Sequence, residues 1–133
     1  MQEAKKTLIF EWVKKAEDDE LNVLSTLKHK DGTPSLVCYL SHQISEKYFK
    51  ALLLFYTNDC PKIHNLAKLS SLISPYIPDI SGKLKSEITS LDPYYIKTRY
   101  PADIPFELFT WKMAEKAYES AKKVKDFVLE KIK

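Results

Sequence analysis

The sequence predicts an all-α protein, folded as an antiparallel up-and-down bundle of four to five helices. Three observations predict this class. Long segments carry apolar residues at helical spacing, glycine occurs only twice in 133 residues, and lysine, leucine, alanine and glutamate are abundant. The breaks between these segments are short, which favours antiparallel neighbours. We therefore expect a single domain that spans residues 1–133.

Composition excludes several classes of protein. Two glycines are too few for a Gly-rich phosphate loop, so P-loop and dinucleotide-binding folds are excluded. A net charge of +3 is too mild to identify nucleic acid as a partner by itself. Cys38 and Cys60 do not form a CxxC motif, and we expect reduced thiols in a cytoplasmic protein. The N-terminus lacks an apolar signal segment, and the longest apolar run, residues 51–56, is too short to span a membrane.

The range 7–28 is predicted to form an amphipathic helix. Its apolar arc consists of Ile9, Trp12, Val13, Ala16, Val23, Leu24 and Leu27. Glu20 falls within this arc, where a carboxylate is unfavourable unless it is paired or reaches water. We favour a local change of helix phase that turns Glu20 outward and Leu21 inward. The alternative is a buried ion pair.

The range 36–57 is predicted to form the central helix, around which the rest of the chain is arranged. One arc is apolar and comprises Val37, Leu40, Ile44, Tyr48, Ala51, Leu52 and Phe55. A second arc is polar and comprises Gln43, Glu46, Lys47 and Lys50, with Tyr39 beside them. This second arc is either a solvated helix face or part of a site. From composition alone, we favour the solvated face.

Two shorter helices are predicted after the central one. Asn65 is a good N-cap for a short third helix, which Pro75 and Pro78 close. Asp79 is the predicted N-cap of a fourth helix that continues to Leu91.

An ordered loop and a last helix complete the chain. The range 92–105 holds three prolines and three tyrosines without a usable period, so we expect an ordered loop. Thr110 is the predicted N-cap of the last helix, which continues to about Lys131.

Arg99 and His64 are the first candidates for chemistry. Arg99 is the only arginine of the chain, and a guanidinium grips phosphate or carboxylate with two parallel bonds. Tyr95 and Tyr100 flank it and are suited to stacking on a base or on the guanidinium. The alternative is that Arg99 pins the loop and that His64 makes a local capping contact. The three histidines show no metal-ligand spacing, so we predict neither a metal site nor a cofactor.

The ordered set of motifs resembles the HEPN domain family (higher eukaryotes and prokaryotes nucleotide-binding). Its parts are Trp12-x3-Ala16, then Ser41-His42-Gln43-x2-Glu46-Lys47-x2-Lys50-Ala51-Leu52, then His64-Asn65-Leu66, then Tyr95-x3-Arg99-Tyr100-Pro101. The resemblance covers nearly the whole chain. It implies an antiparallel helical bundle of prokaryotic origin, usually a homodimer. It also implies pairing with a minimal nucleotidyltransferase in a toxin–antitoxin-like system.

The sequence departs from the family pattern at three places. Some members are metal-independent ribonucleases with an Arg-x(4-6)-His motif, but no histidine follows Arg99 here, so that motif is absent. Glu20 stands where similar sequences tend to carry an apolar residue. Asn65 stands where an aspartate after the histidine is commoner. The absent ribonuclease motif favours a binding protein over an enzyme, without deciding between them.

We therefore expect a protein that binds a nucleotide or RNA phosphate and acts with a nucleotidyltransferase partner. The expected binding residues are Gln43, Lys47, Lys50, His64, Tyr95, Arg99 and Tyr100. One alternative is a metal-independent ribonuclease toxin with a divergent site built from Arg99 and His64. Another is a dimerisation adaptor without a small ligand.

Overall fold

The protein is all-α, as the sequence predicts, and the computed structural model describes residues 2–98 and 108–133. Three helices are long, namely α1 (Glu3–His29), α2 (Pro34–Thr57) and α7 (Trp111–Lys131). Four are short, namely α3 (Leu66–Ile73), α4 (Ile80–Lys83), α5 (Lys85–Leu91) and α6 (Tyr94–Lys97). The described part of the chain contains no strand.

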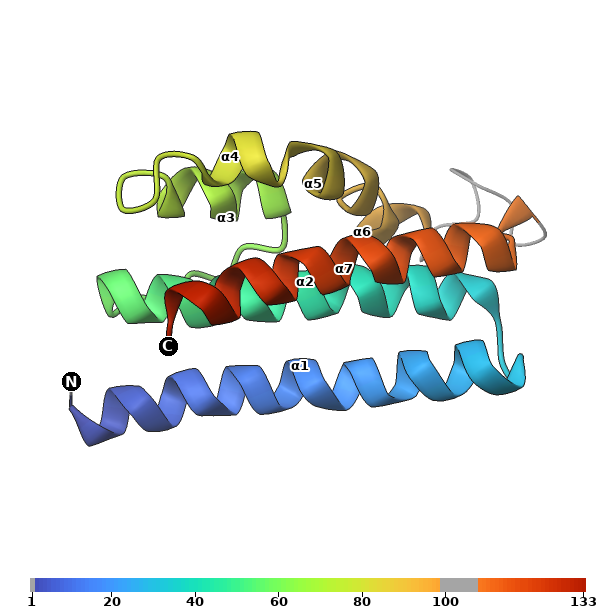
Figure 1. Ribbon diagram of the computed structural model, residues 1–133, viewed down its shortest axis with the longest axis horizontal. Helices are drawn as coiled ribbons and strands as arrows, with labels where there is room; N and C mark the ends of the chain where they lie inside the picture. The colour runs from blue at the N-terminus through green and yellow to red at the C-terminus, as the bar shows by residue number, and fades with distance from the viewer. Residues whose placement is uncertain (1, 99–107) are drawn as a thin grey trace.

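The helices form an up-and-down bundle in which the short helices α3 to α6 occupy the place of one long helix between α2 and α7 (Figure 1). The α1 helix runs along one side of the molecule, and α2 returns antiparallel to it. The chain then returns to the middle of the bundle, and α3 runs in the same direction as α2. The helices α4, α5 and α6 lead back along the side opposite α1, and α7 again runs in the same direction as α2. This arrangement lets α2 pack against α1, α3, α5, α6 and α7, so the predicted central position of this helix is confirmed.

The α2 helix is central because its local sequence starts it sharply and its side chains are mostly apolar. Thr33 is the N-cap, and its hydroxyl accepts a hydrogen bond from the Leu36 N–H. Pro34 occupies the first helical position, where its missing N–H is harmless. The helix buries Ile44, Tyr48 and many other side chains on several faces, as a helix surrounded by neighbours must.

The short helices after α2 agree with the sequence prediction at the start of α3 and differ from it after Asp79. Asn65 caps α3 as predicted, with its side chain accepting from the Lys68 N–H at 2.8 Å. The helix expected after Asp79 is split into α4 and α5 because the Leu84 backbone leaves helical values (φ −110°, ψ 16°). The Asp79 side chain makes no cap hydrogen bond.

Part of the expected loop over 92–105 is also helical. The four residues of α6 fall in it, and an element of this length is too short to show a period. The N-cap of α7 was predicted correctly, since the hydroxyl of Thr110 accepts from the Met113 N–H at 3.1 Å.

The structure places Glu20 differently from the position predicted from the apolar pattern of this helix. Its side chain is buried, with 8% of the residue exposed, whereas Leu21 is 67% exposed. The predicted change of helix phase is therefore wrong. Lys125 donates to Oε1 of Glu20 at 2.8 Å, and the Tyr118 hydroxyl donates to Oε2 at 2.7 Å. Both donors lie on α7, so nothing in the sequence around Glu20 revealed them.

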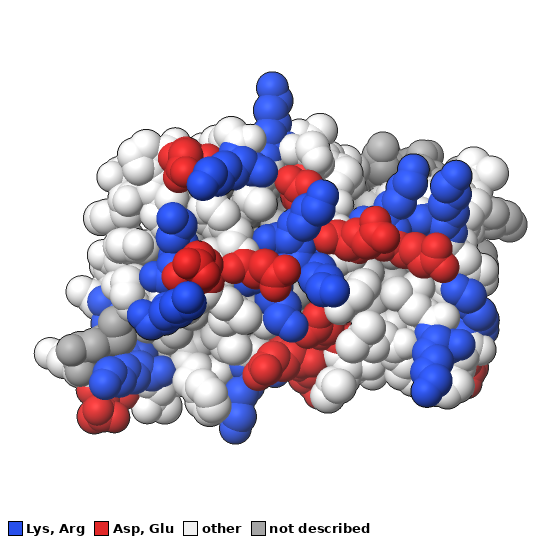
Figure 2. Space-filling model, in the orientation of Figure 1, with Lys and Arg blue, Asp and Glu red and all other residues white. Residues whose placement is uncertain are grey.

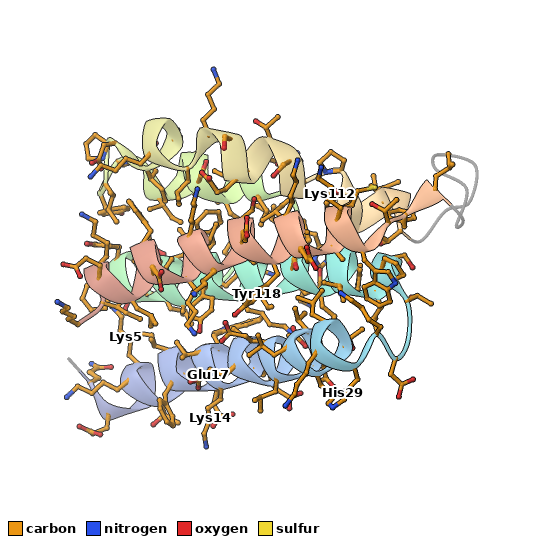
Figure 3. The ribbon with its side chains drawn as sticks, turned by 45° about the vertical axis from the view of Figure 1, so that its right-hand side comes forward. Lys5, Lys14, Glu17, His29, Lys112 and Tyr118 are labelled. Carbon is orange, nitrogen blue, oxygen red and sulfur yellow. The ribbon has the colours of Figure 1, made fainter. Side chains whose placement is uncertain are left out.

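The position of Tyr118 is visible in Figure 3, where it lies between α7 and α1, whereas Lys14 projects from α1 into solvent. Burial alone would raise the pKa of Glu20, but the hydrogen bonds from Lys125 and Tyr118 outweigh burial and hold it below its ordinary value. Glu20 is therefore an ionised group inside the bundle, matched by a lysine.

Charge on the molecular surface is mixed rather than gathered by sign. Figure 2 shows lysine and acidic side chains interspersed across the face that carries α7. The modest net charge therefore does not produce a uniformly basic surface on this face. No helix in the described residues is long and apolar enough to cross a membrane. Cys38 and Cys60 are both free thiols, and Cys38 is buried.

Candidate functional site

An ion-paired carboxylate and an imidazole form the centre of the candidate site. His64 lies between α2 and α3, and its Nδ1 is 3.1 Å and 3.2 Å from the two carboxylate oxygens of Glu46. Glu46 is 4% exposed, whereas 48% of the His64 side chain is exposed. A carboxylate only accepts hydrogen bonds, so we assign the Nδ1 proton to this contact. The opposite ring nitrogen, Nε2, is then the atom left for a ligand.

Glu46 also binds the ammonium group of Lys50. Lys50 Nζ donates to Oε2 of Glu46 at 2.9 Å, and it lies 5.4 Å from the centre of the Trp12 ring. Lys50 is buried, so this charge is matched by its carboxylate and not by water. The polar arc of α2 is therefore not a solvated face, because Glu46 and Lys50 are both buried.

The aromatic ring of Tyr95 packs against the imidazole of His64. Its ring stacks on His64, with ring centres 4.9 Å apart and an angle of 10° between the planes. The same ring lies 5.4 Å from the buried His42 ring at a tilt of 42°. Tyr95 comes from α6, so this short helix places an aromatic ring in contact with both a surface histidine and a buried one.

Asp92 joins the start of α3 to the same cluster. Its two oxygens accept from the N–H groups of Leu66 and Ala67 at 2.7 Å and 3.0 Å, which satisfies two donors at a helix N-terminus. His42 Nε2 lies 3.4 Å from Oδ1, a long contact that is poorly aligned for a hydrogen bond. Burial alone would raise the pKa of Asp92, but His42 and the two N–H groups hold it below its ordinary value.

A small pocket opens beside these groups. It has a volume of about 220 Å³ and is lined by His64, Asn65, Asp92, Tyr95 and Ile96. Pockets for drug-sized ligands typically occupy about 300–1,000 Å³. This pocket therefore suits a phosphate or a single ring, not an entire dinucleotide. Asp92 is engaged with α3, so His64 and Tyr95 are the side chains suited to contact a ligand.

The structure unites some of the predicted binding residues and separates others. His64, Tyr95 and Lys50 belong to one cluster, through Glu46. Gln43 is attached to it by an oxygen 3.1 Å from Nδ1 of His42. Lys47 instead forms an ion pair with Asp19 of α1, so its ammonium group is already matched away from the cluster. Arg99 and Tyr100, which we predicted to bind phosphate, lie outside the described residues.

Sequence reasoning missed three members of this cluster, namely Glu46, His42 and Asp92. A signal for two of them was present. His42, Glu46 and Lys50 are spaced four residues apart, which places them on one face of α2. No comparable signal marked Asp92, because its partners lie 25 and 26 residues earlier in the chain.

The comparisons with known proteins agree with this fold and with the predicted resemblance. A family model described as HEPN domain matches residues 9–132. The chain is also similar to TT1696 from Thermus thermophilus, with 27% identity, a TM-score of 0.82, and coverage of 93% of this chain and 98% of that one. It is similar to ST0689, described as an archaeal HEPN homologue, with 28% identity, a TM-score of 0.74, and coverage of 94% and 98%.

A comparison with curated proteins gives no match. The family model nevertheless covers almost the entire chain, and both solved structures align with it over nearly their whole length. The protein is therefore a member of the HEPN domain family.

Proposed function

We propose that the protein binds a nucleotide or an RNA phosphate at the pocket beside His64 and Tyr95. The observation that carries this proposal is an exposed imidazole, held by the buried Glu46 carboxylate and stacked on Tyr95 at the rim of an open pocket. Aromatic rings of this kind stack on bases, and an imidazole nitrogen without a proton accepts a hydrogen bond from a ribose hydroxyl or a base N–H group. A single nucleotide carries both a base that can stack and polar groups that can bind the imidazole.

The other predicted residues have different roles in this proposal: some contact the ligand, some support the pocket, and one acts at longer range. Arg99 follows Tyr95 by four positions and is proposed to clamp the phosphate, with Tyr100 stacking on the ligand. Lys50 and Gln43 hold the groups behind the pocket, through Glu46 and His42. Lys47, paired with Asp19, contributes charge at longer range only.

We also propose that the protein acts as a homodimer with a minimal nucleotidyltransferase, in a toxin–antitoxin-like pair. Membership of the HEPN family supports this proposal. A second support is apolar surface on α1, where Leu8, Phe10, Leu21 and Leu24 are exposed. Sedimentation equilibrium of the purified protein tests the dimer. Coexpression with a neighbouring nucleotidyltransferase tests the pair, and a monomer that forms no complex with the enzyme contradicts this part.

Titration of the purified protein with ATP, GTP and a short fluorescent RNA tests the binding site. We expect saturable binding that weakens at least tenfold in Arg99→Ala and in His64→Ala. Lys112→Ala is the matched control, since this exposed lysine at the start of α7 lies outside the pocket. Absence of binding to all three ligands, or equal binding by Arg99→Ala, contradicts the assignment of the site.

A second candidate function is RNA cleavage without a metal, and one observation favours it. A carboxylate that holds Nδ1 of a histidine is the arrangement that orients an imidazole as a general acid or base. His64 would remove the proton of a 2′-hydroxyl, whose oxygen then bonds to the neighbouring phosphorus while Arg99 stabilises charge on the phosphate. The bond from phosphorus to the 5′-oxygen breaks, and this oxygen leaves with a proton returned by His64 or water. Incubation of the protein with cellular RNA in EDTA tests this. Cleavage that is lost in both His64→Ala and Arg99→Ala favours the enzyme over the binding protein.

A further inference from the structure

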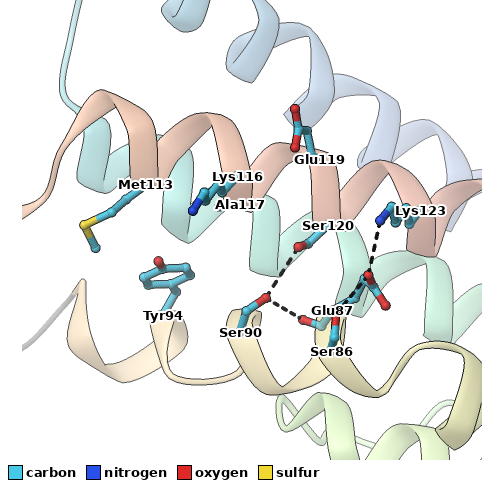
Figure 4. Close-up of a pocket in the computed structure, with 10 residues that line it drawn as sticks. All are labelled: Ser86, Glu87, Ser90, Tyr94, Met113, Lys116, Ala117, Glu119, Ser120 and Lys123. Atoms are coloured by element: carbon cyan, nitrogen blue, oxygen red, sulfur yellow. Dashed lines mark hydrogen bonds and ion pairs between the residues drawn. The ribbon is translucent and has the colours of Figure 1, made fainter.

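A second cavity lies between α5, α6 and α7 and shares no lining residue with the pocket beside His64 (Figure 4). Its volume is about 400 Å³, within the range typical of small-molecule sites. Tyr94 lines this cavity, whereas the next residue of α6, Tyr95, lines the pocket beside His64. The proposed function uses none of the side chains around this second cavity.

A buried carboxylate forms the polar part of its wall. Glu87 of α5 is only 7% exposed. Oε2 accepts from the Ser86 hydroxyl at 3.2 Å and lies 3.7 Å from Lys123 Nζ, whose side chain is 71% exposed. A carboxylate offers about four acceptor positions, and the Ser86 hydroxyl uses one of them, so Glu87 has capacity for hydroxyl donors from a ligand.

Hydroxyl groups continue the polar wall from Glu87 toward α7. Ser90 donates to the Glu87 carbonyl at 3.2 Å, and its oxygen lies 3.4 Å from the hydroxyl oxygen of Ser120. Figure 4 shows these two serines facing each other across the space between α5 and α7. Each serine hydroxyl can both donate and accept, which suits a ligand that carries several hydroxyl groups.

Positive charge and apolar surface complete the cavity. Lys116, Glu119 and Lys123 line it from α7 and are exposed, and Figure 4 shows the Glu119 side chain pointing away from the serines. Tyr94 and Met113 supply apolar surface at the end near α6. The wall therefore presents a buried hydrogen-bond acceptor, neutral hydroxyls beside it, and ammonium groups at the mouth.

We propose that this cavity binds a phosphorylated sugar. The sugar hydroxyls would donate to the carboxylate of Glu87 and exchange hydrogen bonds with Ser90 and Ser120. The phosphate would meet Lys116 and Lys123, which are suited to it as point charges. A free sugar phosphate and the ribose phosphate of a nucleotide share this chemistry. This site is independent of the pocket beside His64.

Isothermal titration of the whole protein with ribose 5-phosphate, AMP, ribose and inorganic phosphate tests the proposal. We expect ribose 5-phosphate or AMP to bind at least tenfold more tightly than ribose or phosphate alone. Tighter binding of AMP that Ser120→Leu abolishes identifies a nucleotide as the source, and tighter binding of ribose 5-phosphate identifies a free sugar phosphate. Failure of both to bind overturns the proposal.

Variants assign the binding to this cavity. Glu87→Gln keeps the shape of the side chain and is expected to weaken binding at least tenfold. Ser120→Leu fills the cavity without touching Glu87 and is expected to abolish binding, so it provides the test if Glu87→Gln fails to fold. Lys112→Ala is expected to leave the binding of ribose 5-phosphate unchanged. Binding of ribose 5-phosphate that survives in Ser120→Leu overturns the assignment and points to the other pocket.

Discussion

Glu46 and His64 are joined by a contact of 3.1 Å that connects the centre of α2 to the segment before α3. The same carboxylate neutralises Lys50 at 2.9 Å. One buried acid therefore orients an exposed imidazole and matches a buried ammonium group. Substitutions at this position consequently affect the stability of the bundle and the geometry of the candidate site together.

Replacement of Glu46 by glutamine is expected to destabilise the protein. Lys50 would remain buried without a counter-charge, and removal of one partner from a buried pair costs about 3–5 kcal/mol. We expect a fall of about 3 kcal/mol in the free energy of unfolding, measured by urea denaturation at pH 7. The double variant Glu46→Gln/Lys50→Met removes the unmatched charge and is expected to regain most of this loss. A double variant as unstable as Glu46→Gln would contradict this account.

The Glu20–Lys125 pair makes a related prediction about the contact between α1 and α7. Lys125→Met leaves the buried Glu20 carboxylate with only the Tyr118 hydroxyl, and we expect a loss of about 2–3 kcal/mol. Glu20→Leu/Lys125→Met replaces both charges with apolar groups and is expected to be within about 1 kcal/mol of the parent. Urea denaturation measures both.

Lys133→Ala is the matched control for that pair, because Lys133 and Glu130 form an ion pair whose side chains are both largely exposed. Its effect is expected to stay within about 0.5 kcal/mol. An equal loss in Lys125→Met and Lys133→Ala would show that the contact between α1 and α7 contributes no special stability.

Asp92 gives the stability of the protein a dependence on acid pH. Its pKa in the folded protein lies below the ordinary value of 3.8, so folding favours the ionised form. The stabilisation is complete above the ordinary value and is lost as the pH falls through it toward the folded pKa. We expect the free energy of unfolding to decline below about pH 5.

The variant Asp92→Asn isolates this contribution, since it cannot ionise. We expect it to be less stable than the parent at pH 7 and to lose less stability between pH 5 and pH 3. Glu20, whose pKa is also lowered, remains in the variant and preserves part of the decline. Urea denaturation at several pH values measures both curves, and parallel curves would contradict a role for Asp92.

Tyr95 is expected to act through its ring when a ligand binds beside His64. Stacking of a base on an aromatic side chain is worth about 1–3 kcal/mol, so Tyr95→Ala should weaken the binding of RNA or ATP by about 5- to 140-fold. Tyr95→Phe keeps the ring and should bind within about twofold of the parent. Fluorescence anisotropy measures both affinities. Equal losses in the two variants would assign the effect to the hydroxyl and contradict stacking.

The helices themselves were predictable because their signals are local. Apolar spacing located α1, α2 and α7, and the caps Asn65 and Thr110 marked helix starts that the structure confirms. The division of one expected helix into α4 and α5 was not predictable. The spacing of apolar residues continues across Leu84, although its backbone does not remain helical.

The site was predictable in part, for the same reason. The motifs indicated His64 and Tyr95, and the structure stacks them. The sequence also suggested that Lys47 and Lys50 act alike, yet one pairs with Asp19 of α1 and the other with Glu46 of its own helix. Only the packing of α1 against α2 separates their roles.

The sequence by itself determined the helical class, the family and the central position of α2, because periodicity, caps and ordered motifs are written along the chain. Tertiary structure alone decided which charges are matched inside the bundle. Glu20 meets Lys125 across 105 positions, and Glu46 meets His64 across 18. Such partners are chosen by the approach of separate helices, because burial makes an unmatched charge unfavourable wherever its counterpart lies in the sequence.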